Sequence, residues 1–223
     1  MTDGLQAAGW ILVLGVGIAG CVQLRRWGVP RTYIRDLLHI GAGIWVLGWP
    51  FWNQWLVPIS IAACAALLVA SAPHLAQRLS VAASFQDSVS DQDERWAGLV
   101  WYTVAFALLT AAGMRHQPFS AAAALWALCL GDGIGGAIGR RFGRRYFRIA
   151  GGKRKSLEGS AAVWVGSAAA AVLASAYFAE PLRIGRVLLL GLVAALAEAL
   201  SPKAMDNILV PLTVWLAAVA TAV

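Results

Sequence analysis

The sequence predicts an all-α fold, a polytopic membrane bundle of about eight transmembrane helices in a single integral-membrane domain over residues 1–223. Of these residues 60% are hydrophobic and only 13% are charged, which leaves too few polar side chains to cover a water-soluble domain. Apolar stretches of about 18–20 residues, the length that crosses a hydrocarbon core, recur along the whole chain. Basic residues are also distributed very unevenly between the connecting loops, as membrane proteins require.

The eight membrane helices are expected at about 5–24, 35–49, 54–72, 96–113, 119–138, 159–178, 186–200 and 207–222. The second, seventh and eighth of these are short for a full span. Short apolar helices are typical of segments that tilt little or end inside a protein-lined cavity. We expect the catalytic core at about 119–212, because the unusual glycine-rich, basic and acidic motifs gather there.

Basic residues gather on one side of the predicted membrane domain. Four loops share that side and hold 15 of the 18 Lys and Arg residues, namely 25–35, 73–95, 140–158 and 201–206. The other side has only Arg115, Arg183 and Arg186. Because basic loops remain in the cytoplasm, we expect these four loops to be cytoplasmic and both termini to lie outside. The net charge of +7 then reflects topology and contact with membrane lipids, whereas nucleic-acid binding would need a basic domain that the chain lacks.

When the loops are set aside, the second half keeps carboxylates at Asp132, Glu158 and Glu198, with Asp206 just before the last helix. Burying an ionised carboxylate is costly unless it is paired, so such residues usually have a function. A structural alternative is a buried ion pair with Arg35 or another neighbour. Convergence of Asp132, Glu198 and Asp206 from separate helices would instead favour a metal site. Mg²⁺ is the expected ion, because it prefers carboxylate and phosphate oxygens.

The segment GDGIGG, residues 131–136, formally matches the dinucleotide-binding pattern G-x-G-x-x-G. No strand precedes it and no βαβ unit follows, so that reading is rejected. Gly135 and Gly139 have the spacing of a close helix contact, which is the structural alternative for this pair. Gly131 and Gly133 flank the aspartate, where the missing side chains would let a phosphate approach the backbone.

The loop that follows contains eight basic residues between Arg140 and Lys155 and no acidic one. Ser156 is a good N-cap for the next helix, and Glu158 and Ser160 fall in its first turn, where backbone N–H groups point outward. A basic loop that leads into a helix N-terminus predicts an anion-binding site. The alternative is that these residues only cap the helix.

The segment EALSPKAMDNILVPL, residues 198–212, repeats this pattern. Glu198 closes one helix, Lys203 adds a base, and Asp206 and Asn207 open the last helix. Capping alone would explain the last two residues. Together with the two preceding motifs, the segment favours contacts to a metal ion and a nucleotide.

In this order, "GDGIGGAIGRRFG", "KSLEGS" and "EALSPKAMDN" resemble the motifs of the polyprenol kinase family, which includes dolichol kinase, phytol kinase and CTP-dependent diacylglycerol kinases. The resemblance covers about residues 35–212. It implies a multi-pass membrane enzyme that transfers the terminal phosphate of a nucleoside triphosphate, commonly CTP, to a lipid alcohol. The compact chain looks most like the bacterial or plastid phytol and farnesol kinases.

The resemblance assigns active-site roles to Asp132, Lys155, Ser156, Glu158, Gly159, Glu198, Asp206 and Asn207. "IRDLLHI", residues 34–40, is similar to the family's Arg-Lys-x-x-His segment. Arg35 and His39 match this segment, but Asp36 replaces the usual lysine. No Walker motif G-x-x-x-x-G-K-[ST] occurs, which excludes a P-loop kinase.

The expected chemistry is in-line attack of a prenol hydroxyl on the γ-phosphoryl group. Asp132, with Glu198 or Asp206, would hold Mg²⁺, while Lys155 and Arg154 offset phosphate charge. Candidates for the general base are Asp132, Glu158 and His39. Two other functions remain open from sequence: a CTP-dependent lipid cytidylyltransferase, and a membrane transporter or lipid-binding protein whose intramembrane acids line an ion path.

Overall fold

The computed structural model describes residues 2–90, 93–148, 154–202 and 204–222, and it confirms the all-α class. The helices are α1 (Asp3–Arg26), α2 (Arg31–Gly41), the 3₁₀ segment η1 (Ala42–Phe51), α3 (Leu56–Ala76), α4 (Ser80–Val89), α5 (Asp93–Arg115), α6 (Pro118–Trp126), the π-helical segment η2 (Ala127–Asp132), α7 (Gly133–Phe142), α8 (Leu157–Tyr177), α9 (Ile184–Leu200) and α10 (Asp206–Ala220). Two short strands, β1 (Tyr146–Arg148) and β2 (Arg154–Ser156), form an antiparallel pair.

Within the described ranges, five helical segments are long and apolar enough to cross a membrane. They are Asp3–Arg26, Leu56–Ala76, Trp96–Arg115, Pro118–Phe142 and Leu157–Tyr177. The other three expected spans correspond to α2 with η1, to α9 and to α10, which are shorter or interrupted. An integral-membrane bundle is therefore consistent with the structure, and the expected total of eight spans stays a prediction.

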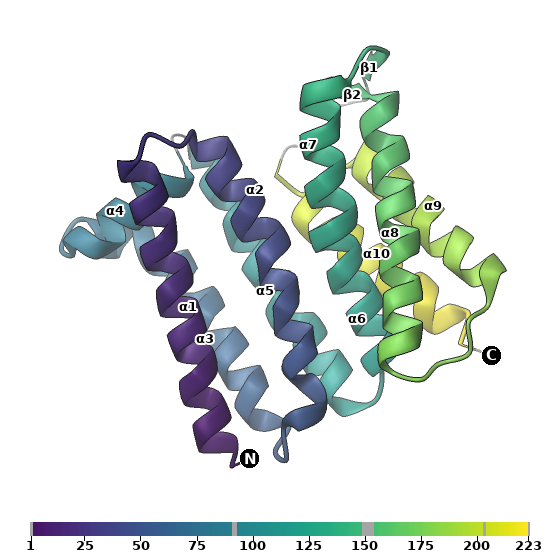
Figure 1. Cartoon of the computed structure of the whole chain (residues 1–223), viewed down its shortest axis with the longest axis horizontal. Coiled ribbons are helices and arrows are strands. Elements are labelled where there is room, and N and C mark those ends of the chain that lie inside the picture. The colour runs from purple at the N-terminus through teal and green to yellow at the C-terminus, as the bar shows by residue number, and fades with distance from the viewer. Residues whose placement is uncertain (1, 91–92, 149–153, 203, 223) are drawn as a thin grey trace.

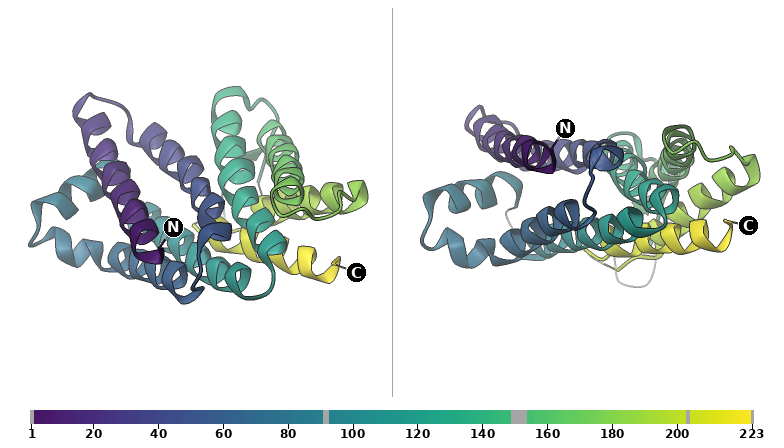
Figure 2. Two further views of the ribbon diagram at one scale, coloured as in Figure 1. Left: turned by 60° about the horizontal axis from the view of Figure 1, so that its bottom comes forward. Right: turned by 90° about the horizontal axis from the view of Figure 1, so that it is seen from below.

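The helices form two groups that meet along α5 and α6 (Figure 1). α1 to α4 lie on one side of this contact, and α7 to α10 lie on the other (Figure 2). The α1–α2 turn and the β1–β2 hairpin lie at the same end of the molecule (Figure 1). α6 is buried from Phe119 to Trp126 and contains four consecutive alanines, so other helices can approach its backbone closely.

The expected helix 35–49 is not continuous. α2 ends at Gly41, and the chain continues as the 3₁₀ segment η1 through Pro50. Indole rings lie against two glycines here, since Trp126 Nε1 donates to the Gly43 carbonyl at 2.8 Å and the Trp10 ring lies against Gly48. A side chain at Gly48 would collide with that ring. The tighter helix thus lies where large aromatic groups pack closely against the backbone.

Two segments expected as loops contain regular structure. α4 occupies much of 73–95, and its Asp87 accepts hydrogen bonds from Arg31 and Arg25, which tie it to α1 and α2. Hydrogen bonding to Arg31 is the largest cause of the lowered pKa of Asp87. The β1–β2 pair occupies the basic loop between α7 and α8.

α7 and α8 pack with their backbones in close contact, as the spacing of Gly135 and Gly139 allowed. A Cβ at Gly135 would collide with Val163 and lie 3.1 Å from the Gly159 carbonyl oxygen. A Cβ at the adjacent Gly136 would meet only the end of the flexible Arg140 side chain, at 3.3 Å.

We therefore expect Gly135→Ala to destabilise the protein by about 1–3 kcal/mol, because the α7–α8 contact would be overpacked. Gly136→Ala, the matched control on the same helix, should be neutral or slightly stabilising because alanine favours helices. Thermal unfolding in detergent measures both. Equal midpoints for the two variants would contradict the packing argument.

Candidate active site

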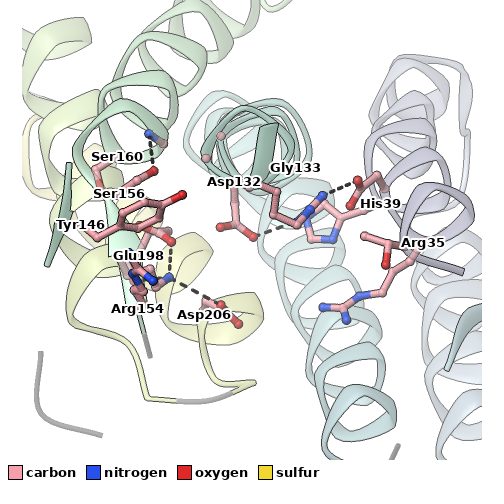
Figure 3. A pocket seen from close by; sticks show the side chains of 18 of the residues that line it. Arg35, His39, Asp132, Gly133, Tyr146, Arg154, Ser156, Ser160, Glu198 and Asp206 are labelled. Carbon is pink, nitrogen blue, oxygen red and sulfur yellow. Dashed lines mark hydrogen bonds and ion pairs between the residues drawn. The ribbon is translucent and has the colours of Figure 1, made fainter. Parts of the chain in front are cut away.

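A cavity of about 510 Å³ opens where the ends of several elements meet. The walls come from one face of α2, from the end of η2 and α7, from the β1–β2 pair and the start of α8, and from the α9–α10 junction. The sequence-predicted residues that line it are Arg35, His39, Asp132, Gly133, Arg154, Lys155, Ser156, Gly159, Ser160, Glu198 and Asp206. The structure thus places most of the predicted site residues around one space (Figure 3).

Asp132 lies between the two walls of this cavity (Figure 3). It ends the π-helical segment η2 and precedes α7, so the helix geometry changes at the candidate catalytic carboxylate. Such π segments inside α-helices are frequent at functional sites. From Asp132 to the end of α7 at Phe142 the helix rises about 15 Å, which puts the carboxylate well inside the bundle. Only 15% of its side chain is exposed.

His39 faces Asp132 from α2. Its Nε2 lies 3.0 Å from the Leu128 carbonyl oxygen and 3.7 Å from Asp132 Oδ2. A carbonyl can only accept, so a hydrogen bond to Leu128 places the proton on Nε2 and leaves Nδ1 as the basic nitrogen of the neutral ring. The Tyr102 hydroxyl donates to the His39 carbonyl at 2.6 Å and also contacts Cys129 Sγ. These contacts hold α2 against the π segment.

On the opposite wall of the cavity, Lys155 connects β2 to the end of α9. Its ammonium group donates to Glu198 Oε1 and, at 3.0 Å, to the Glu198 backbone carbonyl. It also lies 4.0 Å from Asp206 Oδ2. The side chains of Lys155, Glu198 and Asp206 are 13%, 11% and 15% exposed. The ion pair that sequence left as a structural alternative is therefore present, with Lys155 rather than Arg35 as the cation.

The N-terminus of α8 is capped as predicted, since Ser156 Oγ accepts from the Gly159 N–H at 3.1 Å. The Leu157 N–H donates to the Arg145 carbonyl at 2.9 Å. These two backbone N–H groups are thus engaged within the protein. The positive charge that would attract an anion comes mainly from the basic side chains. Ser160 Oγ is different, because it is buried in the cavity wall and has no hydrogen-bond partner among the described residues.

The predicted anion-binding site also contains residues that sequence reasoning missed. In the antiparallel pair Tyr146 is opposite Ser156, and the Arg154 guanidinium lies 3.8 Å from the Tyr146 ring centroid. At the α2 side of the cavity, Arg140 forms an ion pair with Asp36. An aromatic residue within a run of arginines was the only sequence signal for Tyr146. No local sequence signal indicated the ion pair between Asp36 of α2 and Arg140 of α7.

Three predicted residues lie outside the cavity wall, and a fourth, Lys203, is not among the residues that the structure describes. The Glu158 carboxylate accepts from the backbone N–H groups of Arg144 at 3.0 Å and Arg145 at 3.3 Å, so it ties α8 to the chain after α7. Gly131 packs against Ser167 of α8. The third is Asn207, whose side-chain amide donates to the Gly98 carbonyl at 2.9 Å. For Glu158, Gly131 and Asn207 the structure supplies packing or backbone contacts and no place in the cavity wall.

The donors in the cavity can be tested for their fit to Mg²⁺. Among the described residues no group of three His, Cys, Asp or Glu side chains comes close enough to form a ready metal cage. Asp132, Glu198 and Asp206 nevertheless line one cavity, and the buried Glu198 Oε2 lacks a hydrogen-bond partner there. Mg²⁺ usually takes one or two carboxylates together with substrate phosphates and water. These carboxylates therefore fit a metal ion whose remaining ligands come from a bound phosphate group and water.

Comparison with known proteins adds one relative. The chain is 29% identical to a phytol kinase from Synechocystis sp. over 215 residues, which cover 91% of this chain and 88% of the relative. This similarity supports a relationship to the prenol kinases. No protein-family model matches the chain, and no solved structure matches it.

Proposed function

We propose that this protein is a membrane lipid-alcohol kinase that transfers the γ-phosphate of CTP to the hydroxyl of a prenol such as phytol, farnesol or geranylgeraniol. The observation that carries the proposal is the cavity in which carboxylates and basic side chains from α2, η2, α7, β2, α9 and α10 converge at the end of an apolar bundle. Similarity to a phytol kinase along most of both chains supports the prenol as acceptor.

The proposed reaction depends on positioning and on charge neutralisation more than on covalent chemistry by the protein. Asp132, with Glu198 or Asp206, would hold Mg²⁺, which supplies positive charge to the phosphates when it is bound. Lys155 and Arg154 would contact the transferring phosphate from the β2 side. Ser160 Oγ, buried and unpartnered among the described residues, is a further donor for a phosphate oxygen.

The acceptor hydroxyl must lose its proton as it attacks. Asp132 and His39 are the two candidates that line the cavity, since the Glu158 carboxylate is engaged by backbone N–H groups. Nδ1 of His39 is the free basic nitrogen, because Nε2 is directed to the Leu128 carbonyl. The prenol tail would lie in the bilayer between helices, with its hydroxyl near Asp132.

A donor and acceptor panel tests this function. Detergent-purified protein is incubated with Mg²⁺, with γ-labelled CTP, ATP, GTP or UTP, and with phytol, farnesol, geranylgeraniol or the saturated control hexadecanol. We expect label in the organic phase with CTP and a prenol, and much less with hexadecanol. Absence of labelled lipid with every donor, combined with nucleotide binding, would favour the transporter or lipid-binding alternative.

The cavity is proposed to face the cytoplasm, where nucleoside triphosphates are available, because its walls join the basic loops. In a variant lacking the three native cysteines, Arg144→Cys should react with an impermeant thiol reagent in inside-out vesicles only. Arg183→Cys, at the opposite end of α8 and α9, should react in right-side-out vesicles only. Mass-shift labelling of each variant in both preparations measures this, and the reverse pattern would overturn the orientation.

A further inference from the structure

In this structure a lysine ammonium contacts two of the carboxylates that are the proposed metal ligands. Lys155 pairs with Glu198 and lies 4.0 Å from Asp206 Oδ2, and these two acids are the proposed metal ligands on this wall. Building on the proposed function, we propose that Lys155 closes this site to free Mg²⁺, so that the metal binds only together with a polyphosphate that draws Lys155 away.

Because Lys155 and Glu198 are largely buried, each charge needs a partner of opposite sign. The Glu198 side chain is 11% exposed, and an ionised carboxylate with so little water requires a nearby cation. Lys155 supplies one positive charge and no more. A divalent ion placed beside the ammonium would add strong repulsion at short range in a poorly solvated site. Lysine and metal are therefore alternative partners of Glu198.

Two further observations point to a metal that arrives with phosphate. The described residues offer no ready cage of three metal-binding side chains, so additional oxygen ligands must come from elsewhere. Glu198 Oε2 is buried in the site without a hydrogen-bond partner among these residues, although Oε1 is engaged by Lys155. An acceptor that is kept unsatisfied is suited to a ligand that binds later.

Of the two basic side chains on β2, Lys155 is the one free to change partner. The Arg154 guanidinium lies over the Tyr146 ring, 3.8 Å from its centroid, and this stacking holds it in place. The lysine ammonium is a compact charge on a flexible stem, and it can turn from a carboxylate to phosphate oxygens without a new backbone position. The exchange conserves charge pairing, since Lys155 then meets phosphate and Glu198 meets the metal.

Equilibrium dialysis of Mn²⁺, as a countable substitute for Mg²⁺, tests the exchange on detergent-purified protein. The measurement is made with Mn²⁺ alone and with the β,γ-methylene analogue of CTP. Wild-type protein should bind Mn²⁺ at least about tenfold more tightly with the analogue than without it, a factor in the usual range of coupling between two ligands. Lys155→Gln should gain Mn²⁺ binding in the absence of the analogue, and Lys155→Gln/Glu198→Gln should lose that gain. Arg144→Gln, a neutralisation outside the cavity, should behave as wild type.

Tight Mn²⁺ binding by wild-type protein alone would overturn the proposal, as would a Lys155→Gln protein that binds Mn²⁺ no better than wild type. The wild-type comparison needs no variant, so a folding defect in Lys155→Gln leaves the test intact. Phosphotransfer is assayed on the same protein preparations, with γ-labelled CTP in place of the analogue and with phytol added. Lipid phosphate formed without coupled Mn²⁺ binding refutes the exchange but keeps the kinase, whereas coupled binding without any lipid phosphate supports the exchange and removes the kinase.

Discussion

Asp132→Asn is expected to lower the rate of lipid phosphorylation by roughly 100- to 1,000-fold, the loss typical of removing one preorganised charge-stabilising group. The substitution preserves shape but removes the negative charge at the point where α2, η2 and α7 meet. Because the side chain is 15% exposed, little water can replace the lost charge. Turnover of γ-labelled CTP and phytol at saturating Mg²⁺ measures the effect.

Asp87→Asn is the matched control for this substitution. Asp87 also pairs with a basic residue, Arg31, but it lies on α4 and its side chain is 56% exposed. The control should retain transfer activity. A near-normal rate for Asp132→Asn, in protein that unfolds at the wild-type temperature, would make the assignment of Asp132 as a metal ligand wrong.

Lys155→Ala is the second large expected effect, with a loss of about 2–4 kcal/mol of transition-state stabilisation. Lys155 forms an ion pair with Glu198 and lies 4.0 Å from Asp206 Oδ2, and its charge would face the transferring phosphate. Arg144→Ala, in the same basic connection but outside the cavity, should cost little. The measurement is kcat/KM for both variants with CTP and phytol.

Removing Lys155 also leaves Glu198 buried without its cation, so a stability loss could mimic a catalytic one. Thermal unfolding of each variant, with and without Mg²⁺ and the nucleotide analogue, distinguishes a loss of stability from a loss of catalysis. Equal losses of kcat/KM for Lys155→Ala and Arg144→Ala would reduce the proposed anion site to a diffuse basic surface.

The helical class and the approximate positions of most elements could be predicted because they depend on local properties. Apolar length marks the spans, and Ser156 marks the start of α8, where the structure confirms its capping bond. The spacing of Gly135 and Gly139 likewise allowed for the close contact between α7 and α8. These signals lie within a few residues of the features that they predict.

Features that depend on distant contacts could not be predicted in the same way. Arg140 and Asp36 are 104 residues apart, and only the placement of α2 beside α7 makes them partners. The β1–β2 pair has three residues in each strand and shows no alternation of apolar and polar residues. Lys155 and Glu198 were both candidates, but their sequence positions do not reveal that each neutralises the other.

The position of the transferred phosphorus tests the central claim most directly. Purified protein is given phytol, Mg²⁺ and CTP labelled at either the α- or the γ-phosphorus, and the lipid and nucleotide products are separated. The account predicts that the lipid monophosphate carries label from the γ-position only, with the α-label recovered in CDP. Label from the α-position in the lipid, together with released pyrophosphate, would show cytidylyl transfer and contradict the proposed kinase.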